Sequence, residues 1–303
     1  MKAVQLHGYG GVEQLAYEEV PTPRPGNGEV LVRMLATSIN PIDYKIRSGR
    51  MKQAMPVQFP LILGYDVAGE VAQTGEGVSG FRIGDRVMGM VNNSHAEFLV
   101  AKADTLAKVP EGLDLQKAGV IPTVTLTGAQ LIEKGVQPVR GQTILVTGAA
   151  GSVGRTALFV AKQHGAKTVA GIRARQKDDA QSLGADMLIA LDKDEELSAA
   201  PDLDAIADTI NGDTIGKLLP HLKKGGVLGS VLVGKPAAAE KAGIRVNAVV
   251  ARPDSERLYQ LACDVRDGRL KIPIARTFKL NEIRRAHELA EKGGVAGKIL
   301  IIP

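Results

Sequence analysis

The stretch "TILVTGAAGSVG", residues 143–154, restricts the possible folds strongly, because it continues into the helix-like run "SVGRTALFVAKQHG". A strand, a glycine-rich turn and a helix in that order predict a βαβ unit whose turn holds phosphates at the helix N-terminus. Ala149 fills the first glycine slot of the G-x-G-x-x-G pattern, so that slot must tolerate a Cβ. The residues expected to contact a dinucleotide are Gly148, Ala149, Gly151, Ser152, Val153 and Gly154.

Strand and helix patterns alternate from residue 143 onward. The apolar runs "KTVAGI", "DMLIAL", "LDAIADTI", "GGVLGSVLV" and "IRVNAVV" are separated by helical patterns, including "RQKDDAQSLG" and "DTIGKLLPHLKKGG". This alternation predicts a doubly wound parallel sheet with helices on both faces. Residues 1 to about 120 instead show short β-like runs between Gly and Pro clusters. We therefore expect a catalytic domain from 1–122 and 270–303, and a nucleotide-binding domain from 123–269.

The end of the second strand indicates which nucleotide is bound. An NAD site usually has an acidic residue there, whereas "TVAGIRARQK" has none and instead carries Arg173, Arg175 and Lys177. Guanidinium groups pair with a 2′-phosphate in a bidentate way, so the segment predicts NADPH. The alternative is that these bases only solvate the start of a helix.

Composition limits the classes of partner. The formal charge of +5 on 303 residues suits an anionic small ligand and does not require nucleic acid. The single cysteine, Cys263, excludes a cysteine-based zinc cluster, and the five histidines lie far apart in sequence. No apolar signal region opens the sequence, and no run approaches the roughly 18 apolar residues of a membrane helix. We expect a cytoplasmic protein without a metal site.

The short-chain dehydrogenases are a competing family with the motif T-G-x-x-x-G-x-G. Ser152 stands where that spacing needs a glycine, and none of the five tyrosines is followed by lysine four residues later. These departures exclude that family.

Several stretches together resemble the medium-chain dehydrogenase/reductase superfamily, and more narrowly its zinc-free quinone oxidoreductase and enone reductase branch. They are "PTPRPGNGEVLVRMLATSINPIDYKIRSG", "LILGYDVAGEV", "FRIGDRVMG", "AGVIPTVTLTGAQLI", "ILVTGAAGSVG", "QSLGAD" and "GVAGKILIIP". The resemblance implies an α/β protein, with an N-terminal GroES-like β-barrel-type catalytic domain and a Rossmann domain. Tyr65 in "GYD" stands where the zinc enzymes of the superfamily carry a ligand histidine, and their four-cysteine lobe is missing.

The resemblance also implies roles for particular residues. Asn40 is expected near the nicotinamide ribose and substrate, Asp43 orients its loop, and Tyr44 and Tyr65 are candidate hydrogen-bond donors to the substrate oxygen. Packing is the alternative role for both tyrosines. The further residues that the resemblance places near the nicotinamide half are Thr123, Thr125, Thr127, Val233 and Lys298.

The expected activity is NADPH-dependent hydride transfer to a quinone or an α,β-unsaturated carbonyl, by a homodimer and without zinc. A conjugated acceptor delocalises the incoming charge onto oxygen, so it needs no metal to polarise a carbonyl. One alternative is an enoyl-thioester reductase of the same fold. Another is an RNA-binding or crystallin-like structural protein, although ten Phe and Tyr residues and no Trp offer few stacking surfaces.

Overall fold

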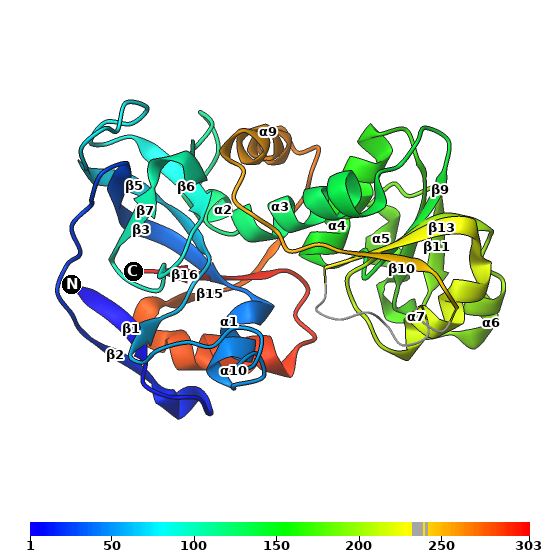
Figure 1. Ribbon diagram of the computed structural model, residues 1–303, viewed down its shortest axis with the longest axis horizontal. Helices are drawn as coiled ribbons and strands as arrows, with labels where there is room; N and C mark the ends of the chain where they lie inside the picture. Colours follow the sequence, from blue (N-terminus) through cyan, green and yellow to red (C-terminus); the bar gives the residue numbers. More distant parts are fainter. Residues whose placement is uncertain (232–238, 240–241) are drawn as a thin grey trace. The chain divides into compact units, whose positions relative to one another are not determined.

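The computed structural model describes residues 1–231, 239 and 242–303, so the predicted cofactor residue Val233 lies outside the described residues. The chain forms two compact units (Figure 1). Unit 1 comprises Met1–Thr123 and Pro253–Pro303, and unit 2 comprises Val124–Arg252. Helix α9 (Ser255–Arg266), which the sequence analysis assigned to the nucleotide-binding domain, belongs to unit 1 because it packs on strand β8 (Leu106–Lys108).

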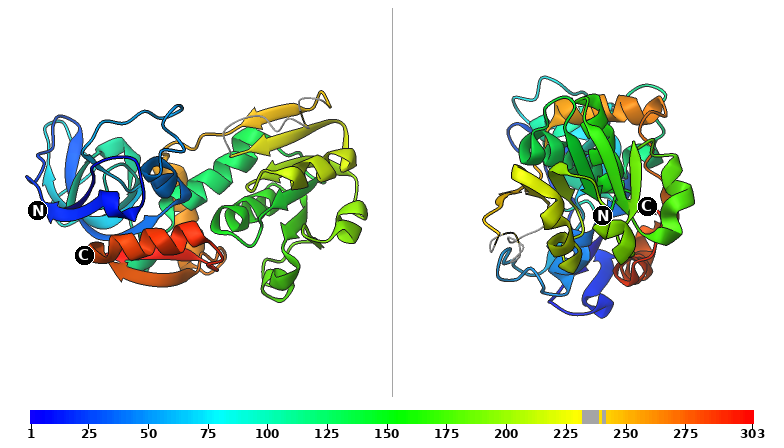
Figure 2. Two further views of the ribbon diagram at one scale, coloured as in Figure 1. Left: turned by 90° about the horizontal axis from the view of Figure 1, so that it is seen from below. Right: turned by 90° about the vertical axis from the view of Figure 1, so that its right-hand side faces the viewer.

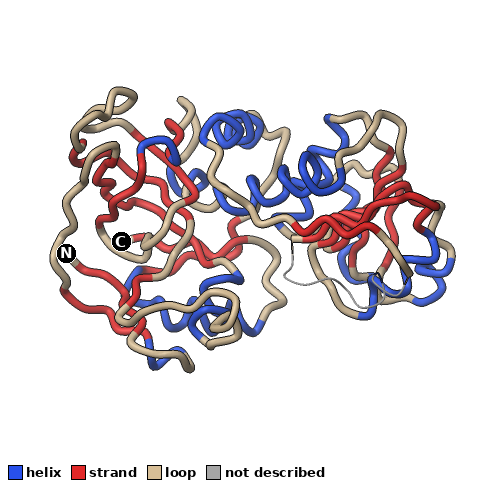
Figure 3. The backbone as a smooth tube through the Cα atoms, in the orientation of Figure 1, coloured by secondary structure: helices blue, strands red, loops and turns tan. Residues whose placement is uncertain are grey.

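Unit 2 is built on a six-stranded sheet in which every neighbouring pair is parallel. Its strands are β9 (Thr143–Thr147), β10 (Lys167–Ile172), β11 (Met187–Ala190), β12 (Leu203–Asp208), β13 (Leu222–Ser230) and β14 (Arg245–Ala248). They lie in the order β11-β10-β9-β12-β13-β14, and Figure 3 shows their backbones as one twisted stack. This is the doubly wound order, in which the strand order reverses between β9 and β12. The predicted Rossmann sheet is confirmed.

Helices cover both faces of this sheet. In the described part of unit 2 the helical elements are α3 (Pro122–Gln130), which begins in unit 1, η3 (Leu131–Val136), α4 (Ser152–Gln163), η4 (Ala174–Gln176), α5 (Lys177–Gln181), α6 (Asp194–Ser198), α7 (Asp213–Leu218) and η5 (Leu219–His221). Leu145 of β9, Leu197 of α6 and Ile215 of α7 belong to one buried apolar cluster, whereas α4 contacts β9 and β10 with its own buried face. The near-continuous apolar strands are therefore buried on both sides, as parallel strands are.

One predicted helix is shorter in the structure. The pattern "DTIGKLLPHLKKGG" predicts a helix through to the glycines, but α7 ends at Leu218 and β13 begins at Leu222. Pro220 has no N–H to continue the helix and its ring clashes with the preceding turn, so only a 3-10 turn follows.

Unit 1 is mostly antiparallel and is centred on the long strand β3. Its strands are β1 (Lys2–Leu6), β2 (Leu15–Glu19), β3 (Glu29–Ile39), β4 (Leu61–Ile62), β5 (Asp66–Thr74), β6 (Arg86–Met90), β7 (Phe98–Lys102), β8, β15 (Ile274–Lys279) and β16 (Lys298–Ile302). β3 pairs with β5, β7 and β16, so the C-terminal segment returns to the N-terminal sheet. Both chain ends accordingly lie in unit 1 (Figure 2). The expected GroES-like domain is confirmed.

Three further α-helices and three 3-10 turns complete unit 1 as described: α1 (Pro41–Arg47), α2 (Leu115–Ala118), α10 (Ile283–Lys292), η1 (Val12–Gln14), η2 (Ala103–Thr105) and η6 (Leu280–Glu282). Helix α10 buries one face against β3, β15 and β16 and lies beside α1 from the other end of the chain (Figure 1). Alternating residues of β3, such as Val30 and Val32, are fully buried in this core.

Candidate functional site

The glycine-rich turn lies at the carboxyl end of β9, where the strand order reverses. In doubly wound folds ligands bind at this switch point. Gly148 has φ +62°, and a Cβ there would lie 2.6 Å from Thr209 Oγ1 at the end of β12. Ala149, in the first glycine slot, is fully buried, and its N–H donates to Gly171 O at 3.0 Å. A side chain is therefore excluded at Gly148, whereas the following position accommodates the alanine Cβ.

The first turn of α4 presents N–H groups that no side chain caps. Gly151 is the N-cap residue with φ −77° and ψ 162° and offers no cap of its own. The first N–H groups of a helix have no intrahelical partner, which leaves those of Ser152, Val153 and Gly154 available to an anion. A Cβ on Gly154 would lie 2.2 Å from Gly148 O, so helix and turn touch directly, whereas Gly151 is exposed. These features fit a bound pyrophosphate.

A buried polar network fixes the sheet edge beside this turn. Asp208, at the end of β12, is fully buried and accepts hydrogen bonds from Thr147 Oγ1 at 2.9 Å and from Ser230 Oγ at 3.0 Å. It also accepts from the N–H groups of Ile210 and Asn211, at 3.1 and 3.0 Å. One carboxylate thus ties the ends of β9, β12 and β13 together, so the turn rests on a rigid edge.

The predicted phosphate-binding bases follow β10. Arg173 and Arg175 are exposed and form no ion pair among the residues that the structure describes. Lys177 differs, because its ammonium group lies 2.6 Å from Glu196 Oε1 in an ion pair. The fold also brings an acid that the local sequence did not show: Asp192 Oδ1 accepts the N–H of Ala174 at 2.7 Å, and that bond lowers the pKa of Asp192.

Arg155 was missed by the sequence analysis. It lies in the second turn of α4, and its Nε donates to Ala150 O at 2.9 Å, so a cation lies against the glycine-rich turn. Burial lowers the pKa of its guanidinium group, with Asp179 partly offsetting the shift. Its terminal nitrogens have no hydrogen-bond partner within the described part of the chain. The sequence signal that could have identified Arg155 is its place immediately after a glycine-rich turn.

Helix α3 carries the three threonines that the resemblance implicated. Thr123 belongs to unit 1 and Thr125 and Thr127 to unit 2. Thr125 is fully buried, whereas Thr127 is partly exposed. Contact of Thr127 with a nicotinamide stays a prediction.

Unit 1 holds a buried polar cluster at the ends of β3, β5 and β16. Asn40 Nδ2 donates to Asp66 Oδ2 at 2.7 Å, and Lys298 Nζ donates to Asn40 Oδ1 at 2.6 Å and to Ile39 O at 3.1 Å. The Lys298 ammonium also lies 3.5 Å from Asp66 Oδ2. Asn40 is 2% exposed, Asp66 0% and Lys298 5%, so all three are buried partners of one another. Lys298, expected beside the nicotinamide, here directs its ammonium into unit 1.

Asp43 has the contacts of a loop-orienting residue. It accepts the N–H of Asn40 at 2.7 Å, which is one half of a capping box at the start of α1, and the N–H of Gly64 at 3.1 Å. It is fully buried, and desolvation raises the pKa of its carboxyl to about 7.

The two tyrosines differ in surroundings. Burial, followed by the nearby Asp43, raises the pKa of Tyr65 to about 12, and its ring packs against the unit 1 core. Tyr44 lies under the guanidinium of Arg50, 5.9 Å from the ring centroid, and desolvation raises its pKa. Both stay protonated near neutral pH and can donate a hydrogen bond.

The fold brings together two histidines that are far apart in sequence. His95 and His287 are both fully buried, with ring centroids 6.0 Å apart. Burial lowers the pKa of His95 to about 4 and that of His287 well below its usual value. No group of three or more His, Cys, Asp or Glu suited to a metal occurs among the described residues.

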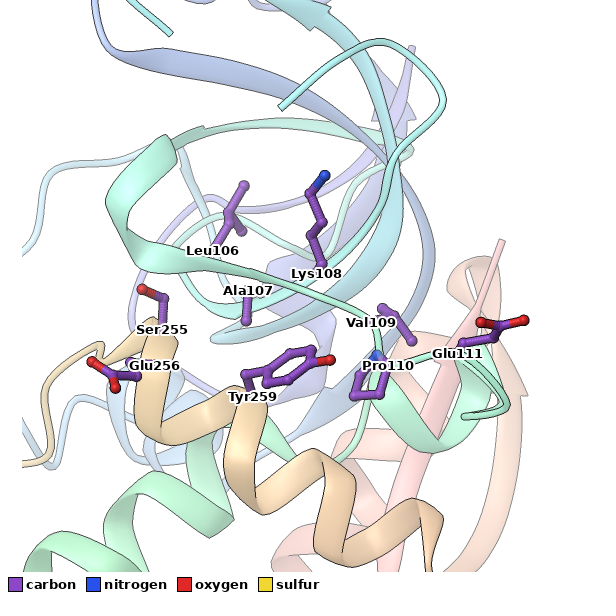
Figure 4. A pocket seen from close by; sticks show the side chains of 9 residues that line it. All are labelled: Leu106, Ala107, Lys108, Val109, Pro110, Glu111, Ser255, Glu256 and Tyr259. Atoms are coloured by element: carbon purple, nitrogen blue, oxygen red, sulfur yellow. The ribbon is translucent and has the colours of Figure 1, made fainter. Parts of the chain in front are cut away.

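A groove of about 510 Å³ opens elsewhere in unit 1 (Figure 4). It lies between segment 106–111 and helix α9, which contributes Ser255, Glu256 and Tyr259. None of the predicted site residues lines it. In the described part of the chain, no helix has the length and apolar character needed to span a membrane.

Comparisons with known proteins agree with this architecture. Residues 26–111 match the alcohol dehydrogenase GroES-like domain, and residues 183–301 match the zinc-binding dehydrogenase family. The chloroplast envelope quinone oxidoreductase homolog of Arabidopsis thaliana is 31% identical over 324 residues, covering 100% of this chain and 98% of that protein. An acryloyl-coenzyme A reductase of Metallosphaera sedula is 28% identical over 349 residues and 99% of each chain.

Solved structures extend the match to three dimensions. The quinone oxidoreductase from Coxiella burnetii superposes with a TM-score of 0.90 at 31% identity, over 100% of this chain and 99% of the other. A mycobacterial protein solved in complex with NADPH has a TM-score of 0.86 at 25% identity, over 100% of both chains. The GroES-like unit, the doubly wound unit and these full-length similarities show that this chain belongs to the medium-chain dehydrogenase/reductase superfamily, in its quinone oxidoreductase and enone reductase branch.

Proposed function

We propose that this oxidoreductase uses NADPH to reduce a quinone or an α,β-unsaturated carbonyl without zinc. The observation that carries the cofactor choice is the pair Arg173 and Arg175, which follow β10 and form no ion pair among the described residues. Two unpaired guanidinium groups suit a 2′-phosphate, which a ribose hydroxyl would not need. Asp192 lies near the same segment and opposes this preference, so the test below includes it.

A bound nicotinamide cofactor supplies the hydride in this chemistry. The first turn of α4 would hold the pyrophosphate with N–H groups, and Arg173 and Arg175 would hold the 2′-phosphate. Tyr65, with a pKa of about 12, stays protonated and can donate a hydrogen bond to the charge that develops on the substrate oxygen. Asp43 keeps the start of α1 in place through the N–H groups of Asn40 and Gly64.

The residue at position 65 supports the proposal that catalysis is zinc-free. Tyr65 stands where zinc enzymes of the superfamily have a histidine, and a phenol that stays protonated is a poor metal ligand. An enone or quinone accepts hydride at a carbon or ring position conjugated to oxygen, so hydrogen-bond donors suffice to stabilise the product charge. Chloroplast quinone oxidoreductase homologues are among the relatives, which supports this acceptor class.

An enoyl-thioester reductase is the second candidate. It is favoured by the full-length similarity to an acryloyl-coenzyme A reductase, and its acceptor is likewise a conjugated carbonyl. A screen of NADPH oxidation with 1,4-naphthoquinone, trans-2-hexenal, cyclohex-2-enone and crotonyl-coenzyme A separates the two candidates by kcat/KM. Absence of turnover with all four would overturn the enzymatic proposal and favour the binding or structural alternatives.

The cofactor proposal is tested with an Arg173→Ala/Arg175→Ala double variant. Charge-assisted hydrogen bonds contribute roughly 1.5–3 kcal/mol each, which corresponds to about tenfold or more in affinity per arginine. Solvent screening of these exposed groups reduces that factor. The kcat/KM ratio for NADPH over NADH should therefore fall by at least about tenfold, while kcat at saturating NADPH is retained. Lys177→Ala is the matched control, because its ion pair with Glu196 already occupies that ammonium group.

Asp192→Asn should move the same ratio in the opposite direction, because it removes a negative charge beside the segment. An unchanged ratio in the double arginine variant would show that the two arginines only solvate the helix start.

We also propose a homodimeric cytoplasmic enzyme that acts on a small molecule and binds neither nucleic acid nor membrane. Light scattering of the purified protein tests the dimer.

A further inference from the structure

Asp66 is the centre of the buried cluster in unit 1, and the sequence analysis gave it no role. Its carboxylate is fully buried and accepts hydrogen bonds from Ser38 Oγ, from Asn40 Nδ2 at 2.7 Å and from the N–H of Thr123 at 2.6 Å. The Lys298 ammonium lies 3.5 Å away. One side chain at the start of β5 therefore joins the ends of β3 and β16 and the first turn of α3.

The pairing fixes which way the Asn40 amide points. Its Nδ2 faces a carboxylate, which only accepts hydrogen bonds, and its Oδ1 faces an ammonium group, which only donates them. Turning the amide over would place NH₂ against the ammonium and oxygen against the carboxylate. Both bonds would become repulsive inside a buried site, where such charges interact strongly. Asn40 is thus locked in one orientation.

Burying the Asp66–Lys298 ion pair costs free energy, and this cost favours a positioning role over a purely stabilising one. Removing two charges from water is expensive, and well-packed apolar side chains often serve stability as well or better. Asp66 and Lys298 are 0% and 5% exposed, and together they occupy both polar atoms of Asn40. Asp66 also accepts the N–H of Thr123, the last residue of unit 1 before the chain enters unit 2.

We propose that Asp66 is a positioning residue for the reduction: with Lys298 it holds the Asn40 amide and the first turn of α3 in the geometry that the reaction uses. This inference rests on the proposed function, since it matters only if Asn40 lies at the reacting centre. Asp43 does not share the role, because in the described part of the chain its carboxylate accepts hydrogen bonds from the backbone N–H groups of Asn40 and Gly64.

The experiment separates positioning from stability by neutralising the pair in two steps. Asp66→Asn leaves a buried ammonium group without its carboxylate, and Lys298→Met leaves the carboxylate without its ammonium group, so each should lower Tm. Asp66→Asn/Lys298→Met removes both charges and should recover most of that loss. If Asp66 positions Asn40, kcat/KM stays about 10²-fold below wild type in the double variant, because a small misplacement of a reacting group costs that much.

A double-mutant cycle with Asn40→Ala measures how strongly Asp66 and Asn40 are coupled in kcat/KM, and a purely structural role of Asp66 would produce no such coupling. When Asp66 acts through Asn40, Asp66→Asn costs less than about twofold in kcat/KM once Asn40 is alanine. Asp264→Asn is the matched control: Asp264 is 6% exposed, and its Oδ1 lies 2.7 Å from Arg269 Nη2 within unit 1. It should lower Tm and leave kcat/KM unchanged.

The outcomes distinguish the two levels of the proposal. If kcat/KM returns with Tm in Asp66→Asn/Lys298→Met, or if the Asn40 cycle is additive, Asp66 is a structural residue only and the positioning role is overturned while the enzyme assignment stands. If wild-type protein oxidises NADPH with none of the four acceptors, the proposed function fails, and the positioning role fails with it.

Discussion

Replacing Gly154 with alanine should damage both folding and cofactor binding. A Cβ at this position would lie 2.2 Å from Gly148 O and 2.7 Å from Ala149 Cα. Both atoms belong to the backbone of the turn, so no side chain can swing away. Restoring ordinary contact, at roughly 3.5 Å, requires α4 and the turn to separate by about 1 Å.

The magnitude has two opposing parts. Overpacking of a close contact typically costs about 1–3 kcal/mol. Alanine inside a helix is better than glycine by about 1 kcal/mol, which offsets part of that cost. We therefore expect Gly154→Ala to lose up to about 2 kcal/mol of unfolding free energy. Each phosphate hydrogen bond lost by moving the helix end costs roughly 1.5–3 kcal/mol, or about tenfold or more in the Kd for NADPH.

Gly151→Val is the contrasting variant. Gly151 is exposed, has an ordinary φ of −77°, and its Cβ would meet only Gly148 O, at 3.2 Å. The fold should tolerate valine with little change in Tm, while the branched side chain fills the space that a pyrophosphate needs, so NADPH binding should be lost.

Calorimetric titration with NADPH and thermal unfolding without cofactor measure both effects. Gly154→Ala with wild-type Tm and wild-type Kd would refute the close packing of α4 on the turn. Wild-type affinity in Gly151→Val would show that the nucleotide sits elsewhere.

Three other predictions concern groups away from the glycines. Arg155→Gln should raise the Kd for NADPH about tenfold, because the half-buried guanidinium group lies against the turn at Ala150. An unchanged Kd in a calorimetric titration would show that Arg155 only supports the loop. His95 and His287 are held neutral with pKa values below the unfolded 6.5, so unfolding free energy is lost as pH falls from 6.5 through about 4. The pKa of Asp43 is raised to about 7, so its contribution to unfolding free energy increases as pH falls over this range and opposes that of the histidines. The test therefore compares wild type with His287→Leu, and the Tm of the variant should fall less between pH 7.5 and 5. Equal losses would contradict the histidine account. Purified protein should contain far less than one zinc per chain by mass spectrometry of metals, and a chelator should leave activity intact; stoichiometric zinc coupled to activity would contradict the zinc-free proposal.

Local sequence patterns were enough to predict the class of fold and the position of the glycine-rich turn. These rest on short-range signals: continuous apolar strands, helical periodicity, and glycines at fixed spacing between a strand and a helix. The doubly wound parallel sheet of unit 2 was expected from these signals and from the family resemblance, and it is confirmed; the structure adds its strand order and the pairing of β16 with β3. Where a local signal was overridden, as at Pro220, the reason was also local, because the proline ends the helix at Leu218.

Which polar groups contact one another depends on the tertiary fold. Pairing of β10 with β11 brings Asp192 beside Ala174, although no acid lies in the local stretch after β10. Asp66 and Lys298 come from opposite ends of the chain and are joined because β16 pairs with β3 and β3 pairs with β5. Charge pairing and burial depend on distances across a sheet, and a linear pattern carries no such distances. That is why Asn40 could be named from sequence, whereas the carboxylate that holds it could not.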